Sequence, residues 1–461
     1  MIQVGIGVWV SRRIRTEDQY LVAGRSLGYG LTTFSVFATW FGAETIVGAA
    51  GSAYRDGLTP ASAEPFGYGL CLILMGALFA VPLWRRRLTT LADLFAQRYS
   101  SGVARFAAAV LIPSSVLWAA AQVRAFGQVL ATTSPGLDVS TAVGVAAAFV
   151  VAYAMFGGLL ADAITDVVQG ALLVVGLVVL GVAVVVQLGG PEASVEAVRS
   201  GGGLRLTSDP SGSWLATLEA WAIPVLGSVV AAELVARVIA ARSPTVARRS
   251  VLMGGGLYLA IGLVPVFIGL AAPVLVPALG LTLADAEQLV PAVAQVLLPT
   301  LLHALFIGGL ISAILSTVDS TLLVASGLLS HNVIVPMLGA PSERTKVRIA
   351  RAGVAGFGLV AYLLAVSAEG VFALVEEASA FGSAGAVVTI CFALFTPWGG
   401  PRTAYATLAL GLLAYVGGGL AALPYPFLLS IAVALATYVT GALVEPATER
   451  ARTPLQPVSG P

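Results

Sequence analysis

Long apolar stretches recur along the whole chain, and they limit its fold more than any other feature. About 20 consecutive apolar residues in helical form cross the hydrocarbon core of a bilayer, where unpaired backbone groups are costly. The runs are rich in Leu, Val, Ala and Gly and lack the alternation of barrel strands. We therefore expect an all-α membrane protein with about 13 transmembrane helices. The candidate spans are residues 1–10, 28–54, 61–84, 104–132, 140–156, 160–188, 214–240, 250–276, 290–330, 350–367, 371–396, 403–421 and 423–444.

Composition excludes several classes of protein. Of the 461 residues 58% are hydrophobic and 10% are charged, whereas soluble domains carry about 25% charged residues. The lipid bilayer is therefore the expected partner, and a net charge of +1 gives no reason to expect nucleic acid. The sequence contains no nucleotide-binding loop of the Gly-x-x-x-x-Gly-Lys-Ser/Thr type, which argues against an ATP-driven pump.

The distribution of Lys and Arg orients the spans, because these residues favour the cytoplasmic side. If the N-terminus lies outside, the outer loops contain only Arg55, Arg199 and Arg205, and the inner loops contain the other loop cations. We therefore expect a multi-pass protein of the inner (plasma) membrane, with its N-terminus outside and its C-terminus in the cytoplasm. Residues 1–10 are short for a span and have no basic segment or cleavage site, so we expect a trimmed or mis-assigned start rather than a signal peptide.

The spans predict one transmembrane domain over residues 1–461. Residues 28–188 and 214–396 each contain five spans, and an odd number forces the two groups into opposite orientations. Inverted repeats of this kind place a binding site near the bilayer midplane, where helices are interrupted. Residues 403–444 would add two C-terminal helices, and residues 445–461 would form a cytoplasmic tail.

The second span contains a candidate interruption. Gly42, Gly48 and Gly51 lie around Glu44, and each Gly costs about 1 kcal/mol relative to Ala inside a helix. Glycines gathered beside an ionisable group suggest a broken helix at a binding site. The alternative is close helix packing through small residues, which is common in membranes.

Four motifs occur in order along the chain: RRIRTEDQYLVAGRSL at 12–27, LTTLADLFAQRY at 88–99, GGLLADAITDVVQ at 157–169 and SAILSTVDS at 312–320. In this order and at this spacing they resemble the sodium:solute symporter family, whose members include proline, sugar, pantothenate and choline carriers. The resemblance extends over nearly the whole chain. It implies a leucine-transporter-type fold of two inverted five-helix repeats, Na⁺ as the coupling ion, no other cofactor and no enzymatic activity.

The last motif suits a sodium site. Na⁺ is a hard cation that seeks oxygen ligands. Residues at i, i+3 and i+4 share a helix face, so the Ala313 carbonyl can lie beside the hydroxyls of Ser316 and Thr317. The resemblance adds the carbonyls of Ala38 and Phe41 in the broken span. Alternatively, both hydroxyls bond back to carbonyls of their own helix.

Three aspartates fall inside spans, where a carboxylate costs about 2.5 kcal/mol or more. By the resemblance, Asp166 corresponds to an aspartate near the ion exit route. Asp162 could be an interfacial charge. Asp319 could tune the ion site, contact a cationic substrate or pair with Arg124 in the fourth span.

The solute pocket is expected on the broken helix and the next two spans. By the resemblance, Trp40, Tyr68 and Trp118 fall where the choline branch carries the aromatic residues that bind its ammonium group. Glu44 matches a carboxylate position of the sugar branch, and Thr45 follows it. Ring faces attract a quaternary ammonium by about 0.5–2 kcal/mol per contact.

One aromatic residue of the choline branch has no counterpart, because the equivalent stretch at 229–233 reads VVAAE. An acidic and aromatic pocket suits a proline-like zwitterion or a choline-like cation. The predicted function is therefore Na⁺-coupled symport of a small organic solute by alternating access. The alternatives are a proton-coupled carrier in which Asp166 or Asp319 takes up the proton, and a transporter-like sensor.

Overall fold

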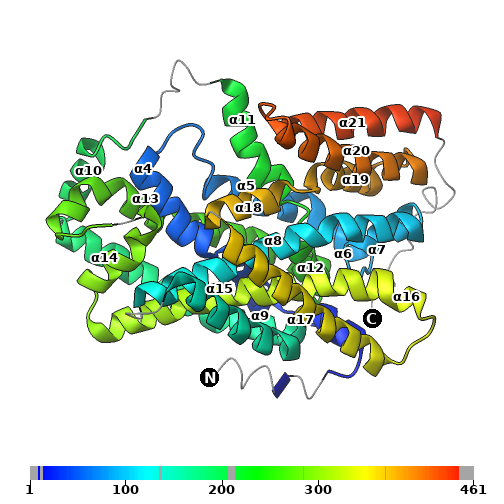
Figure 1. Ribbon diagram of the computed structural model, residues 1–461, viewed down its shortest axis with the longest axis horizontal. Coiled ribbons are helices and arrows are strands. Elements are labelled where there is room, and N and C mark those ends of the chain that lie inside the picture. Colours follow the sequence, from blue (N-terminus) through cyan, green and yellow to red (C-terminus); the bar gives the residue numbers. More distant parts are fainter. Residues whose placement is uncertain are drawn as a thin grey trace.

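The computed structural model describes residues 9–10, 14–133, 138–205, 213–283, 285–368 and 370–445, and this part of the chain is almost entirely helical (Figure 1). The expected all-α class is confirmed. The helices of the first half are α2 (Glu17–Val22), η1 (Ala23–Arg25), α3 (Tyr29–Trp40), η2 (Glu44–Gly48), α4 (Ala49–Asp56), α5 (Phe66–Leu74), η3 (Met75–Phe79), α6 (Ala80–Arg85), α7 (Ala92–Arg98), α8 (Ser101–Thr133), α9 (Val139–Gln187) and α10 (Pro191–Ser200).

The second half continues the same pattern of long helices joined by short turns. Its helices are α11 (Trp214–Ala222), η4 (Ile223–Gly227), α12 (Ala232–Ala240), α13 (Pro244–Ala278), η5 (Ala286–Gln288), α14 (Leu289–Leu297), α15 (Thr300–Leu329), η6 (Ser330–Ile334), α16 (Val335–Met337), α17 (Glu343–Ser367), α18 (Val371–Ala380), α19 (Ser383–Phe395), α20 (Pro401–Leu420) and α21 (Pro426–Val444).

Within the described residues, 10 helices are long and apolar enough to cross a membrane. Two further predicted spans are helical but fail that length test. Residues 28–54 are divided among α3, η2 and α4, and residues 140–152 form a shorter apolar helix. Most of the predicted span 1–10 and of the tail 445–461 lies outside the described residues. The structure therefore supports a multi-pass membrane protein, whereas the full count of spans stays a prediction.

The predicted boundary between spans 140–156 and 160–188 falls at a kink inside α9. Gly158 has φ 62° and ψ 174° there, a conformation that only glycine adopts without strain. The next segment differs from the expectation. Residues 188–213 are rich in Gly, Ser and Pro and suggest a flexible external loop, but Pro191–Ser200 form the helix α10, which begins with proline at its first position.

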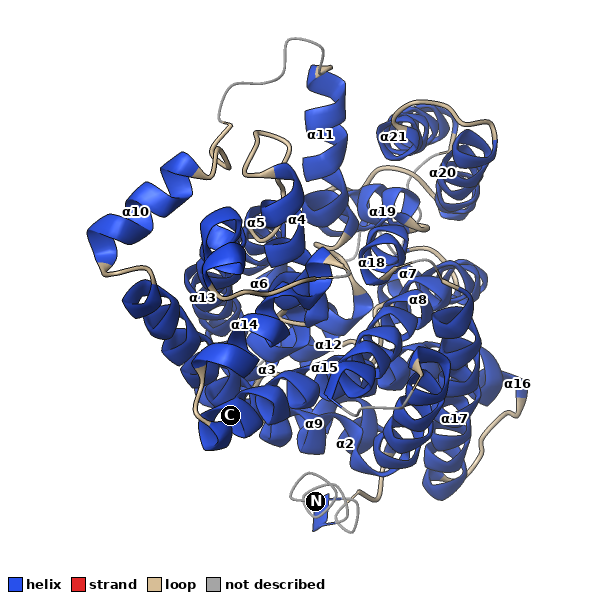
Figure 2. Ribbon diagram, turned by 60° about the vertical axis from the view of Figure 1, so that its left-hand side comes forward, coloured by secondary structure: helices blue, strands red, loops and turns tan. Residues whose placement is uncertain are grey.

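The bundle is built around α15, which packs against α8, α9 and α17. On another side, α13 packs along α3, α4 and α5. Figures 1 and 2 show α20 and α21 together at one edge, against α19. The helices that line the candidate site are therefore central, and the two C-terminal helices are peripheral.

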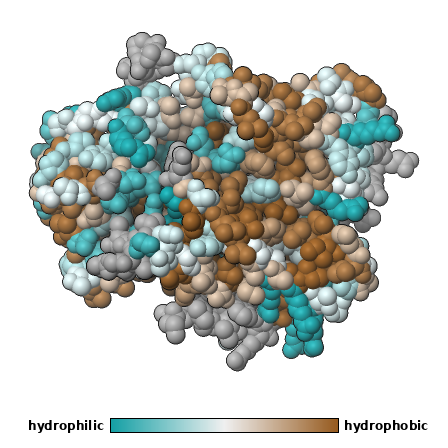
Figure 3. Space-filling model, in the orientation of Figure 1, coloured by the Kyte–Doolittle hydropathy of each residue, from teal (hydrophilic) through white to brown (hydrophobic). Residues whose placement is uncertain are grey.

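The surface suits a lipid environment. Large apolar side chains such as Val186, Leu420 and Leu443 are more than two thirds exposed. Figure 3 shows a broad apolar area across the middle of one face, with hydrophilic residues gathered toward the ends of the molecule. Such an area in water would favour aggregation, whereas lipid tails cover it without cost.

Close contact between α13 and α4 depends on one glycine. A Cβ atom added to Gly269 would lie 2.4 Å from the backbone oxygen of Ala50 and 2.7 Å from the Cβ of Ala53. Backbone atoms cannot move aside as a flexible side chain can. This contact therefore fixes the spacing between α13 and α4, the C-terminal part of the broken span.

We expect Gly269→Ala to lower the thermal unfolding midpoint of the purified protein, since overpacking of this kind costs about 1–3 kcal/mol. The control is Gly256→Ala on the same helix, where an added Cβ meets nothing within 4 Å. It should leave the midpoint unchanged or raise it, because Ala is the better helix former. Equal midpoints for the two variants would contradict the proposed contact.

Candidate functional site

The second span is interrupted where the glycines lie. Helix α3 ends at Trp40, and Phe41 has φ −92° and ψ 67°, which is not helical. The chain resumes as a π-helical turn at Glu44–Gly48. A Cβ on Gly42 would lie 2.6 Å from a carboxylate oxygen of Glu44, so a side chain at this position would displace that carboxylate. The break expected from the sequence is therefore present.

The amide of Gln122 on α8 holds the broken segment. Its Nε2 donates to Glu44 Oε2 at 2.7 Å, and its Oε1 accepts from the backbone N–H of Ala43 at 3.2 Å. Gln122 is fully buried, and Glu44 is 2% exposed. The other oxygen of Glu44 has no hydrogen-bond partner among the described residues. Glu44 therefore offers a free acceptor inside the bundle.

The expected ion ligands lie on two helices that meet at the break. Thr317 Oγ1 on α15 lies 3.3 Å from the carbonyl oxygen of Thr39 and 3.3 Å from that of Ala313. Ala38 and Phe41 are fully buried at the end of α3, and so is Ala313. Hydroxyl and carbonyl oxygens from two helices thus gather at one point, which is the donor chemistry that a hard cation requires.

The Ser316 hydroxyl donates to Asp166 Oδ1. The other oxygen of Asp166 accepts from Ser35 Oγ on α3 at 2.5 Å. Asp166 on α9 therefore joins α3 to α15 directly beside the expected ion ligands. The hypothesis that both hydroxyls only bond back to their own helix does not hold for Ser316, while Thr317 does make such a bond as well.

A buried ion pair lies beside Ser320, which is one turn further along α15 than Ser316. Arg237 on α12 pairs with Asp162 on α9, and both side chains are completely buried. Ser320 Oγ donates to Asp162 Oδ2 at 2.7 Å. Asp162 therefore is not an interfacial charge. Sequence reasoning missed Arg237 as its partner, because nothing in the spacing of the two residues indicates that α9 and α12 meet there.

Asp319 belongs to this group of charges by position. It is 1% exposed, and neither carboxylate oxygen has a hydrogen-bond partner among the described residues. Its electrostatic neighbours are Asp162, Asp166 and Arg237. The cation beside it is thus Arg237 rather than Arg124, whose guanidinium donates to the carbonyl of Ala365. A contact between Asp319 and the solute stays a prediction.

The three expected aromatic residues form one cluster. The ring centroids of Trp40 and Trp118 are 5.6 Å apart, and those of Tyr68 and Trp118 are 6.0 Å apart. All three side chains are buried. The two indole N–H groups have no hydrogen-bond acceptor among the described residues. Buried donors without partners are costly, so the cluster favours a ligand that carries an acceptor.

Hydrogen bonds connect this cluster to neighbouring helices. Tyr68 Oη and Ser379 Oγ on α18 lie 2.9 Å apart, and Ser228 donates to the same serine at 3.3 Å. The hydroxyl of Thr45 lies 2.7 Å from Tyr258 Oη on α13. The Thr45 hydroxyl is therefore hydrogen-bonded to α13.

The segment that lacks the fourth aromatic residue is also irregular. Helix η4 ends at Gly227 and α12 begins at Ala232, with extended backbone angles at Ala231. Glu233 follows in the first turn of α12, where it is 4% exposed and one of its oxygens has no partner among the described residues. A second helix is thus interrupted, and it too presents a buried carboxylate.

Comparison with known proteins agrees with this geometry. The sequence pattern of the sodium:solute symporter family matches residues 20–411 of this chain. The human high affinity choline transporter 1 is 29% identical over 399 residues, which are 80% of this chain and 66% of that protein. The sodium/proline symporter of Escherichia coli strain K12 is 28% identical over 403 residues, covering 83% of this chain and 78% of that protein.

Solved structures share the fold. The substrate-bound outward-open state of a Na⁺-coupled sialic acid symporter has a TM-score of 0.85 at 18% identity, covering 97% of this chain and 96% of that one. A nucleobase-cation-symport-1 family transporter in a closed conformation has a TM-score of 0.62 at 14% identity, with 94% and 97% covered. The chain spans about two thirds of the length of the choline transporters it matches. The match over residues 20–411 shows that the chain belongs to the sodium:solute symporter family, and its helices, broken span and motifs agree with this.

Proposed function

We propose that the protein is a secondary transporter that couples the entry of Na⁺ to the uptake of a small organic solute by alternating access. The observation that carries this proposal is the approach of Thr317 on α15 to the Thr39 carbonyl at the broken end of α3. In the proposed site, the hydroxyls of Ser316 and Thr317 and the carbonyls of Ala38, Phe41 and Ala313 bind the ion. Asp166 lies beside them and adds negative charge on the ion route.

The proposed solute carries a positive nitrogen and an oxygen acceptor. The ring faces of Trp40, Tyr68 and Trp118 suit the cationic end, as in other ammonium sites. The free indole N–H groups of the two tryptophans suit a hydroxyl or carboxylate. A choline-like cation and a proline-like zwitterion both meet these requirements. Glu44 would balance the positive charge, with Thr45 next to it.

The proposed architecture has about 13 spans, with two inverted groups of five at 28–188 and 214–396. The interruptions at Phe41 in the first group and at Ser228–Ala231 in the second support this arrangement, since each occurs in the first span of its group. The proposed location is the plasma membrane, with the N-terminus outside and the C-terminus in the cytoplasm. The loop arginines support this orientation.

The sodium site predicts the effect of Thr317→Ala. Loss of one oxygen ligand should raise the Na⁺ concentration for half-maximal response about tenfold or more, equivalent to roughly 1.4 kcal/mol. The measurement is a Na⁺ titration of intrinsic tryptophan fluorescence, because Trp40 directly follows Thr39. Thr317→Ser keeps the hydroxyl and should retain most of the affinity.

The matched control is Thr321→Ala. This threonine lies one turn further on α15 and bonds back to the carbonyls of Thr317 and Val318. The Thr321→Ala substitution should leave the fluorescence response to Na⁺ unchanged. A fluorescence response that K⁺ reproduces, or uptake that depends on a proton gradient and not on Na⁺, would exclude sodium coupling.

The solute site predicts different effects for two substitutions at Trp118. Trp118→Ala should weaken binding of choline or proline at least about tenfold, since the central ring of the cluster is lost. Trp118→Phe keeps a ring face but removes the indole donor, so it should weaken proline binding more than choline binding. Radioligand binding in the presence of Na⁺ measures both, with the exposed Trp214→Phe as control. Unchanged affinity in Trp118→Ala would disprove the site.

A further inference from the structure

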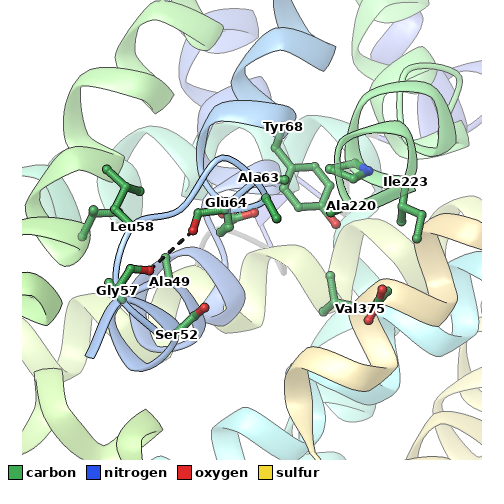
Figure 4. A pocket seen from close by; sticks show the side chains of 16 residues that line it. Ala49, Ser52, Gly57, Leu58, Ala63, Glu64, Tyr68, Ala220, Ile223 and Val375 are labelled. Atoms are coloured by element: carbon green, nitrogen blue, oxygen red, sulfur yellow. Dashed lines mark hydrogen bonds between the residues drawn. The ribbon is translucent and has the colours of Figure 1, made fainter. Parts of the chain in front are cut away.

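A cavity of about 260 Å³ lies next to the aromatic cluster, on the side that the arginine distribution assigns to the outside. Ala61 and Glu376, both exposed, lie at its rim. Its walls are mostly apolar and come from α4, the 57–64 segment, α11, η4, α13 and α18. Figure 4 shows Glu64 and Tyr68 on one wall, with Ser52 and Val375 across the open space.

The side chains that line this cavity carry negative charge when they are ionised. Two glutamates line it, Glu64 and Glu376, and none of the described lining residues is Lys, Arg or His. Glu64 is partly accessible, and its Oε1 accepts a hydrogen bond from Tyr258 Oη at 2.8 Å. This bond fixes the carboxylate at the wall without neutralising it. Apolar walls strengthen the attraction between a carboxylate and a cation, because they exclude water.

Tyr68 connects this cavity to the inner cluster. Its ring contacts Trp118, and it also lines the outer cavity. Its hydroxyl lies 2.9 Å from Ser379 Oγ across the bundle. Glu376 precedes Ser379 by three residues on α18, which is about one helical turn, and Glu64 lies in the segment that leads into α5. Tyr68 therefore lies between the cavity and the inner cluster, and its hydroxyl connects it to Ser379 on α18.

We propose that this cavity is an outer subsite for a small organic cation, which binds between Glu64, Glu376 and the ring of Tyr68 before the Tyr68–Ser379 pair opens to the inner cluster. The inference rests on the proposed function for the identity of the cation as the transported solute. Binding in the outer subsite itself requires no Na⁺, because none of the proposed ion ligands lines the cavity.

The apolar surroundings of Glu64 and the nearby Glu44 raise the pKa of the Glu64 carboxyl to about 8, against the opposing hydrogen bonds from Tyr258 and Thr45. The groups that face Glu64 are thus Glu44 on η2, Tyr258 on α13 and Tyr68 on α5. Below this pKa the carboxyl is protonated and gives no charge to a cation. Its ionised fraction rises from roughly a tenth at pH 7 to roughly nine tenths at pH 9. Cation binding should therefore strengthen as the pH rises.

The test measures protection of a cysteine placed in the cavity. Ser52→Cys is introduced into full-length protein in which Cys391 is replaced by Ser, while Cys71 is fully buried. The rate of modification by a membrane-impermeant thiol reagent is measured in KCl without Na⁺, at pH 7 and pH 9. Tetramethylammonium chloride is the probe, and the uncharged tert-butanol is its control.

We expect tetramethylammonium to slow the modification. The concentration that gives half-maximal protection should be about tenfold lower at pH 9 than at pH 7. Glu64→Gln should weaken protection about tenfold at pH 9 and abolish its pH dependence. Glu376→Gln, at the exposed rim, provides a second variant whose folding is not in question. The control Glu377→Gln should have no effect, because Glu377 does not line the cavity and accepts a hydrogen bond from Tyr415.

Equal protection by tert-butanol, or protection that neither glutamine substitution weakens, would overturn the outer subsite. The result is independent of the proposed sodium coupling, which is tested separately by the Thr317 variants. Protection without Na⁺ together with Na⁺-independent uptake would retain the subsite and reject sodium symport. Sodium-dependent uptake without protection would retain sodium symport and reject the subsite.

Discussion

The break in the second span determines where the other polar groups of the bundle must lie. Between Trp40 and Glu44 the backbone leaves the helical path, so its amides and carbonyls lose their usual partners. Inside a bilayer these groups must be satisfied by other parts of the protein or by a ligand. Gln122 reaches the break from α8, and Thr317 reaches it from α15. A cation at this point would supply what the remaining carbonyl oxygens lack.

The charges of α9, α12 and α15 also favour a bound cation near the break. Asp162, Asp166 and Asp319 are all buried, whereas Arg237 is the cation that pairs with this group. Serine hydroxyls satisfy part of the first two carboxylates, but they add no charge. If all three acids are ionised, the group is negative even after Arg237 is counted. Such a field attracts a cation toward Thr317, and it explains why a positive ion would stabilise this packing.

The sequence predicted the features that depend on local composition. The apolar runs located the helices, the glycines around Glu44 located the break, and the spacing of Ala313, Ser316 and Thr317 located the helix that faces it. The sequence did not predict contacts between helices that are far apart along the chain. Arg237 is one of many arginines in the chain, and only the packing of α12 against α15 reveals its role. Glu64 similarly lies in a connecting segment, and its place in a cavity depends on α13 and α18.

The two proposed binding sites share one short piece of backbone, and this explains how they could be coupled. The carbonyl of Thr39 faces Thr317, and the ring of the next residue, Trp40, contacts Trp118. An ion that orders the end of α3 therefore also fixes the first ring of the solute cluster. A solute that holds Trp40 in place stabilises the same backbone for the ion. Each ligand should thus raise the affinity for the other by the same factor, because the coupling free energy belongs to the shared segment and not to either site.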